Sequence, residues 1–219
     1  MSKTGLNSAP PPRGGFTLIE LLTVIVIIAL LLTILVPTIK GIIMQGYAAK
    51  TRARINALSN GAYAYYEDTA RRFYPGQQYS NWSVLPTAPT TGSQVLALCL
   101  FSPKPGVTGV SFPTDVYASY TPDILFTSNG KNNTIADTFP DTMPICYYPS
   151  HIGNTGVGQF FESDNSAYTS GAVSPNSPGF NAFITNQVTN NAYCDGSFLI
   201  IAPGTARKYF DQANVTNFR

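Results

Sequence analysis

The sequence has few charged residues, and this scarcity excludes several classes of protein. Charged side chains make up 11% of the 219 residues, whereas an average soluble domain has about 25%. The formal net charge is only +2, which argues against a basic surface that neutralises many phosphates, so nucleic acid is not an expected partner. A hydrophobic share of 44% excludes disorder caused by low hydrophobicity and high net charge. Much of the soluble surface must therefore consist of uncharged Asn, Ser, Thr and Gly.

Residues that commonly form catalytic or metal sites are also scarce. His151 is the only histidine, and it lies in a Pro-Ser-His-Ile-Gly segment that indicates a structural or solvated side chain. The sequence contains no phosphate-binding Gly loop with Lys, no Gly-x-Ser-x-Gly nucleophile elbow and no His/Cys metal cluster. We therefore expect no catalytic residue and no enzyme activity.

The cysteines are few and odd in number: Cys99, Cys146 and Cys194. Outside the cytoplasm two of them could form a disulfide, but the sequence does not choose among the three pairings. Their spacings do not form a zinc motif, and all three could equally be small buried apolar residues.

One long apolar run, Phe16–Val36, dominates the N-terminal part of the chain. It holds 21 residues and a single ionisable side chain, Glu20. At about 1.5 Å per residue, a helix of this length is about 32 Å long, close to the roughly 30 Å hydrocarbon core of a bilayer. We therefore expect one transmembrane helix over residues 16–36, with a buried core helix as the alternative. The lipid bilayer is thus an expected partner.

The segment before this run, residues 1–15, is polar, Pro-rich and carries only the positive charges of Lys3 and Arg13. The positive-inside tendency places it in the cytoplasm and everything after Val36 outside. Basic residues beyond the span, from Lys40 to Arg54, oppose that orientation, so the charge rule alone is ambivalent. A secretory signal peptide would have its apolar segment before the cleavage site. The junction between the two segments must therefore decide the orientation.

The junction is the segment GFTLIE, residues 15–20. With the short basic leader before it and the apolar run behind it, this segment resembles the prepilin signature of type IV pilins and of the pseudopilins of type II secretion systems. The resemblance covers about residues 13–40. It implies that a prepilin peptidase cuts after Gly15, removes residues 1–15 as a leader and methylates the new amine of Phe16. Gly14 offers a second glycine, but cleavage there would shift Glu20 out of register.

Glu20 is the only acidic residue in the expected span. A buried charge costs several kcal/mol unless it is paired, so an intramembrane carboxylate indicates a function with a specific partner. The resemblance implies that Glu20 pairs with the Phe16 amine of a neighbouring subunit in a growing filament. The alternative is that Glu20 lies near the membrane edge and reaches the interface without a partner.

The helical pattern continues past the span. Pro37 lies where the family often has a helix-loosening proline, and it is expected to kink the helix. Apolar residues at spacings of three and four then predict an amphipathic segment over residues 37–74, ended by Tyr74-Pro75-Gly76. The basic cluster Lys50–Arg54 is either a solvated face or a contact with anionic lipid or a neighbouring subunit.

Residues 75–219 are expected to form a globular head. The resemblance and the pattern together predict an α+β, pilin-like fold, with the long helix packed on a small antiparallel β-sheet and long loops. Val95–Phe101 favours a helix, whereas Ile145–Tyr148 and Phe198–Ala202 are typical of strands. Residues 150–192 are rich in Asn, Ser and Gly, lack periodicity and predict a surface insertion.

The end of the chain, Phe198–Phe218, is similar to the end of the major pseudopilins, where a strand leads into a turn and an acidic loop. Four residues match that outline: Gly204, Asp211, Asn217 and Phe218. In many members this loop binds calcium. Here Ala206 and Asn214 stand where acidic ligands are expected, so Asp211 is a weak candidate ligand and no metal or other cofactor is favoured.

These features predict a structural subunit of a type II secretion pseudopilus, located in the bacterial inner membrane with one pass. Its head would lie in the periplasm, or at the cell surface after assembly into a helical filament. Expected partners are further copies, other pilin-like subunits, prepilin peptidase and an inner-membrane assembly platform. The alternatives are a type IV pilin or minor pilin serving adhesion, motility or DNA uptake, and a membrane-anchored periplasmic enzyme or ligand-binding protein. Leader removal would leave 11 of the 13 basic residues, equal to the 11 acidic ones.

Overall fold

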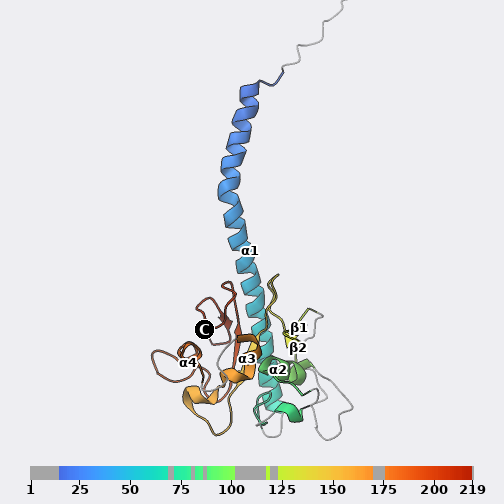
Figure 1. The fold of residues 1–219 in the computed structure, drawn as a ribbon, viewed down its shortest axis with the longest axis vertical. Helices are drawn as coiled ribbons and strands as arrows, with labels where there is room; N and C mark the ends of the chain where they lie inside the picture. Colours follow the sequence, from blue (N-terminus) through green and yellow to red (C-terminus); the bar gives the residue numbers. More distant parts are fainter. Residues whose placement is uncertain are drawn as a thin grey trace, which may run out of the picture. The chain divides into compact units, whose positions relative to one another are not determined.

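The computed structural model describes residues 15–68, 72–79, 82–85, 88–101, 117–118, 123–169 and 176–218. The chain divides into two compact units, Met1–Ile43 and Met44–Arg219. Helix α1 (Leu18–Asp68), of 51 residues, contributes to both units (Figure 1).

In the first unit, α1 exposes apolar side chains on every side. All residues from 15 to 43 are exposed, including Phe16 at 75%. The helix is long and apolar enough to cross a membrane by length and composition. Its threonine hydroxyls donate to carbonyls one turn back, Thr23 to Ile19 at 2.7 Å and Thr33 to Ala29 at 2.8 Å. The helix therefore leaves these hydroxyls satisfied without water.

The helix is continuous through Pro37, which lies in its interior as expected. The end of the helix differs from the prediction. The described helix ends at Asp68, residues 69–71 lie outside the described residues, and Arg72 has a left-handed φ of 52°. The predicted end at Tyr74-Pro75-Gly76 is therefore too late. A residue with positive φ ends a helix, and Pro75 disfavours helical geometry at the residue before it.

In the second unit, the buried face of α1 forms the main core. Its apolar members match the predicted pattern: Ile55, Leu58, Ala62 and Tyr65. Helix α2 (Gly92–Phe101) packs in the same core and confirms the helix predicted at Val95–Phe101. An added Cβ at Gly92 would lie 1.8 Å from the Tyr147 carbonyl oxygen, so only glycine allows this close approach of α2 to the sheet.

Two antiparallel sheets complete the α+β head. Strands β1 (Leu125–Ser128) and β2 (Lys131–Ile135) form a hairpin. Strands β3 (Cys146–Pro149), β4 (Phe198–Ala202) and β5 (Val215–Thr216) pair in the order β3-β4-β5. Both predicted strands are thus confirmed, and so is the small antiparallel sheet.

Every residue of β3 and β4 is buried, because the sheet has a core on each face. Tyr147 and Ile200 face the α1 and α2 side, whereas Tyr148 and Leu199 belong to a second apolar cluster. Alternation along the strands produces this division, since successive side chains point to opposite faces.

The second cluster corrects the prediction of a surface insertion over residues 150–192. The described part of this segment forms η2 (Gly156–Gln159), η3 (Glu162–Asn165), α3 (Ser166–Thr169) and α4 (Pro178–Ile184). Four of its large apolar side chains are buried: Phe160, Phe180, Phe183 and Ile184. The helices are too short to show periodicity, and the polar residues cap them. Ser177 Oγ, for example, accepts a hydrogen bond from Phe180 N at 3.2 Å. A further short element, η1 (Trp82–Val84), contributes Trp82 to the main core.

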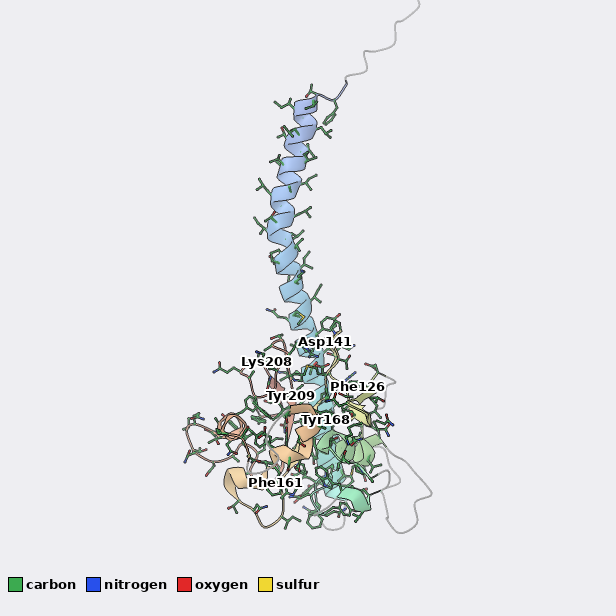
Figure 2. The ribbon with its side chains drawn as sticks, in the orientation of Figure 1. Phe126, Asp141, Phe161, Tyr168, Lys208 and Tyr209 are labelled. Carbon is green, nitrogen blue, oxygen red and sulfur yellow. The ribbon has the colours of Figure 1, made fainter. Side chains whose placement is uncertain are left out.

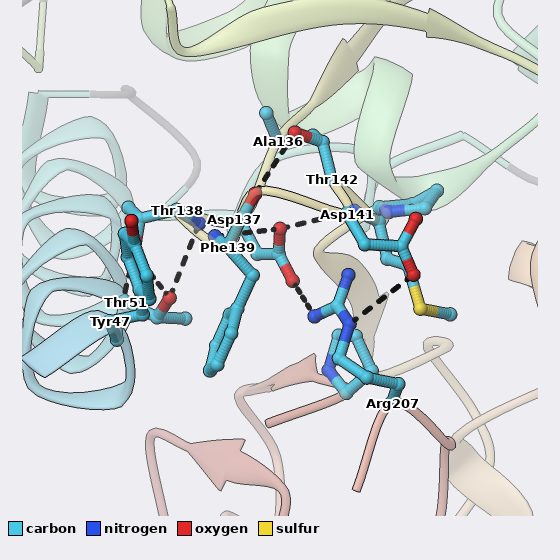
Figure 3. A network of polar contacts seen from close by, with 12 residues as sticks. Tyr47, Thr51, Ala136, Asp137, Thr138, Phe139, Asp141, Thr142 and Arg207 are labelled. Carbon is cyan, nitrogen blue, oxygen red and sulfur yellow. Dashed lines mark hydrogen bonds and ion pairs between the residues drawn. The ribbon is translucent and has the colours of Figure 1, made fainter. Parts of the chain in front are cut away.

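A polar network joins α1 to the loop after β2 and to the C-terminal loop (Figure 3). Thr138 Oγ1 lies 2.8 Å from Thr51 Oγ1 and donates to the Tyr47 carbonyl at 2.9 Å. The guanidinium of Arg207 pairs with the buried Asp137 carboxylate and lies 4.7 Å from the Phe139 ring centroid. Three segments that are distant in sequence are thus held together by buried polar contacts.

Replacing Arg207 with Met is expected to destabilise the folded protein by about 3–5 kcal/mol at pH 7, because it leaves the Asp137 carboxylate buried without its counter-ion. Burial already raises the pKa of Asp137, while the Arg207 contact lowers it in part. The variant should therefore be more stable in acid, where Asp137 is protonated, and lose that stability as the pH rises through the Asp137 pKa. Thermal unfolding of the detergent-solubilised chain between about pH 4 and 7 measures this. The same loss at every pH would contradict it.

Candidate functional site

The predicted cleavage site lies immediately before α1. Gly15, Phe16 and Thr17 are exposed and non-helical, and the helix begins at Leu18. An added Cβ at Gly15 would meet nothing within 4 Å. The peptide bond between Gly15 and Phe16 therefore lies outside the helix, where a protease can approach it without unwinding helical structure.

Glu20 and Thr17 form a capping box at the start of α1. Glu20 Oε2 accepts hydrogen bonds from Thr17 N at 2.8 Å and from Thr17 Oγ1 at 2.7 Å. In return, Glu20 N donates to Thr17 Oγ1 at 3.3 Å. This reciprocal arrangement satisfies backbone donors that a helix start leaves unpaired. Thr17 was not among the predicted site residues, although the pattern Thr-x-x-Glu before an apolar run is a capping signal.

The capping box fixes the Glu20 carboxylate beside the residue that follows the cleavage site. Among the described residues, the second carboxylate oxygen, Oε1, accepts no hydrogen bond. An ammonium generated at Phe16 by cleavage, in this copy or another, could therefore bind Glu20 without breaking its contacts with Thr17.

The family model of the prokaryotic N-terminal methylation motif matches residues 11–36. The chain carries a type IV pilin-like prepilin motif. The motif supports processing by prepilin peptidase and assembly with other pilin-like subunits. Together with the long apolar helix α1, it indicates a single-pass, membrane-anchored protein. No curated protein and no solved structure matches the chain.

The C-terminal loop of this prepilin-like chain does not fit a calcium ion. Asp211 Oδ1 accepts a hydrogen bond from Ala213 N at 2.8 Å. The Asn214 amide donates to the carbonyls of Pro203, at 3.1 Å, and Lys208. These hydrogen bonds occupy two carbonyl oxygens that a cation could otherwise bind. The single carboxylate of Asp211 is also fewer than the number that calcium prefers. No group of three or more His, Cys, Asp or Glu residues is positioned to hold a metal within the described ranges.

All three cysteines are free thiols in the structure, so the disulfide that the sequence left open is not formed. Cys99 belongs to the main core and Cys146 to the second cluster, on the other face of β3 and β4. Burial raises the pKa of each of these two thiols to about 12. Thiolate is scarce at neutral pH, and both thiols are therefore poorly reactive. Cys194 is half-buried against the second cluster.

His151 has the structural role that its sequence context suggested. Its Nε2 lies 3.0 Å from Asp164 Oδ2, and its ring stacks on Phe161 with centroids 4.0 Å apart. Burial raises the pKa of Asp164, and the hydrogen bond with His151 opposes this. Because Asp164 is almost fully buried, His151 satisfies a carboxyl group that would otherwise lack a partner.

Proposed function

We propose that this chain is a structural, non-enzymatic subunit of a type II secretion pseudopilus. The observation that carries the proposal is the prepilin motif at residues 11–36, which spans the predicted cleavage site and the apolar start of α1, with Glu20 in its first turn. The similarity of Phe198–Phe218 to the end of the major pseudopilins supports the pseudopilus over other pilin-like filaments.

In the proposed mechanism, prepilin peptidase hydrolyses the bond after Gly15 and methylates the Phe16 amine. The subunit is stored in the inner membrane with its head in the periplasm. On assembly, the Phe16 ammonium of one subunit pairs with Glu20 of its neighbour. The exposed apolar side chains of residues 16–43 then exchange lipid for contacts with the same helix of other subunits. A separate motor acting through the assembly platform would supply the energy for extraction from the membrane.

A type IV pilin or minor pilin is the second candidate, and two departures of the C-terminal loop from the pattern of the major pseudopilins favour it. Asn214 and Ala206 replace acidic ligands that the major pseudopilins use for calcium, and the Asn214 amide closes the loop with hydrogen bonds. The two candidates differ in phenotype. Deletion of a pseudopilin should abolish secretion of exported proteins, whereas deletion of a pilin should abolish surface filaments, adhesion, motility or DNA uptake.

Intact-mass and N-terminal peptide analysis of the membrane form tests cleavage and methylation, which both candidate functions require. We expect a chain that begins at Phe16 and carries one methyl group on its amine, because cleavage and methylation follow from the motif. An unmethylated chain that retains Met1 or Ser2 would contradict the proposal. It would favour a membrane-anchored enzyme or ligand-binding protein instead.

A further inference from the structure

The first unit carries only two ionisable side chains among its described residues, Glu20 near the start of α1 and Lys40 near the end of the unit. Both are exposed, as are all the side chains between them, which project from the helix on every side (Figure 2). Twenty helical residues separate Glu20 from Lys40, and at about 1.5 Å per residue they cover about 30 Å. The hydrocarbon core of a bilayer is also roughly 30 Å thick. The spacing therefore matches one charged group at each face of the hydrocarbon.

Lys40 lies on the polar side of the last turns of this unit. Successive side chains of a helix are about 100° apart around the axis, so Thr38 and Gly41 share the side of Lys40. The opposite side consists of four exposed apolar residues: Val36, Ile39, Ile42 and Ile43. The end of the first unit is therefore amphipathic, and its apolar side continues for three residues past Lys40.

An ordinary tilt of the helix in a bilayer accommodates both sides. Transmembrane helices are tilted by about 20° on average. Across a helix about 10 Å wide, such a tilt places one side about 3–4 Å deeper than the other. The three residues from Lys40 to Ile43 rise by a similar amount, about 4.5 Å. Lys40 can therefore lie in the headgroup layer while Ile43, on the other side, remains at the edge of the hydrocarbon.

Within the first unit, a second copy of the chain offers no counter-ion at this depth. Glu20 is the only carboxylate among the described residues of the unit, and it lies about 30 Å from Lys40 along the axis. Two copies would have to be displaced by that whole length to bring the two side chains together. Pairing of the Phe16 amine with Glu20 of a neighbour needs a displacement of only about 6 Å. Lipid headgroups, by contrast, present phosphate at the face of the hydrocarbon, where basic side chains gather.

We propose that Lys40 binds the phosphate of a phospholipid headgroup in the leaflet at the C-terminal end of the span, and that this contact sets the depth of α1 in the membrane. The stretch within the hydrocarbon then runs from Glu20 to Lys40, four residues later than the expected span of residues 16–36. Glu20 lies at the opposite face, where it keeps its contacts with Thr17 until assembly. The inference rests on the membrane-anchored part of the proposed function and holds for either candidate filament.

Solid-state NMR of the full-length, ¹⁵N-lysine-labelled chain in vesicles of phosphatidylethanolamine and phosphatidylglycerol tests the contact. We expect ³¹P to dephase the Lys40 Nζ signal, which is identified by its absence in Lys40→Gln. The same chain in a phosphorus-free detergent with inorganic phosphate should show no dephasing, because the contact depends on depth in the bilayer. Dephasing in the detergent sample would overturn the lipid assignment. A Lys40 signal that ³¹P leaves unchanged in vesicles would also overturn it, and is the result expected if a protein carboxylate binds Lys40.

Two substitutions test the effect of Lys40 on depth. Water-edited spectra of the vesicle samples locate the residue at which α1 leaves the lipid. Lys40→Leu should move this point by about one helical turn, toward Ile43, because no ammonium then has to stay at the level of the phosphates. Thr38→Leu is the matched control, since it adds the same side chain on the same side and removes a hydroxyl that already donates to the Ile34 carbonyl at 2.9 Å. It should leave the point unchanged. An unchanged point in Lys40→Leu would overturn the role of Lys40 in setting the depth.

These outcomes are distinct from those that test the proposed function. Intact-mass analysis of the wild-type chain reports cleavage after Gly15 and methylation of Phe16, and filament yield reports assembly. A cleaved, methylated and assembled chain whose Lys40 has no phosphate contact would overturn this inference alone. A chain that retains residues 1–15 and that alkaline carbonate releases from the membrane would overturn the proposed function itself.

Discussion

Replacing Gly15 with Val will leave the chain uncleaved and therefore unassembled. A peptidase must bring its catalytic groups close to the backbone at the scissile bond, and a glycine before that bond permits the closest approach. A misplacement of about 1 Å at a reacting centre can reduce a rate about 100-fold. We expect a reduction of at least this size in the rate of leader removal, seen as a membrane form that retains residues 1–15 in intact-mass analysis.

The structure makes this variant a test of recognition rather than of folding. A Cβ at Gly15 meets nothing within 4 Å, and the same is true of Gly41 inside α1. Gly41→Val is therefore the matched control, since it adds the same side chain at another exposed glycine of the first unit without touching the cleavage site. Gly14→Val tests the register, and it should be cut. Efficient cleavage of Gly15→Val would contradict the assignment of Gly15, whereas loss of cleavage in Gly14→Val alone would move the site by one residue.

Elements with a strong local signal could be predicted from the sequence. The buried face of α1 followed from apolar spacing, with Ile55, Leu58 and Tyr65 all in the core. The strand Phe198–Ala202 has the same bounds in the structure as in the prediction, because five consecutive β-prone residues strongly favour a strand. The second core was missed because Phe160 lies between two helices of four residues each and Phe180 lies in a helix of seven residues. Elements this short do not show a hydrophobic period.

In the candidate site, too, residues with a local sequence signal could be predicted, whereas contacts between distant parts of the chain could not. Gly15, Phe16 and Glu20 followed from a resemblance that six consecutive residues carry. Thr17 was within the same six residues and was overlooked, although its spacing from Glu20 is a capping signal. The pairing of Asp137 with Arg207 joins residues that lie 70 positions apart. No local pattern predicts such a contact, which depends on how the tail folds back beside α1.

Changing Glu20 to Gln should preserve leader removal but abolish incorporation into filaments. Gln keeps a side-chain oxygen that can accept from Thr17 N and Thr17 Oγ1, so the capping box survives. It removes the negative charge, which leaves the Phe16 ammonium of the neighbouring subunit buried among apolar helices without a counter-ion. We therefore expect the association constant to fall by more than about 100-fold, because a charge left without its counter-ion in an apolar environment is strongly unfavourable.

Thr17→Val is the complementary variant, because it removes the hydroxyl of the capping box and keeps the carboxylate. Loss of a capping side chain costs only about 1 kcal/mol, so this variant should be cleaved and should still assemble, with at most a modest decrease. Filament yield after shearing, measured against the amount of processed subunit in the membrane, separates the two effects. If Glu20→Gln assembles normally and Thr17→Val does not, Glu20 acts by shaping the start of the helix. If only Glu20→Gln fails, its charge is what the neighbouring subunit requires.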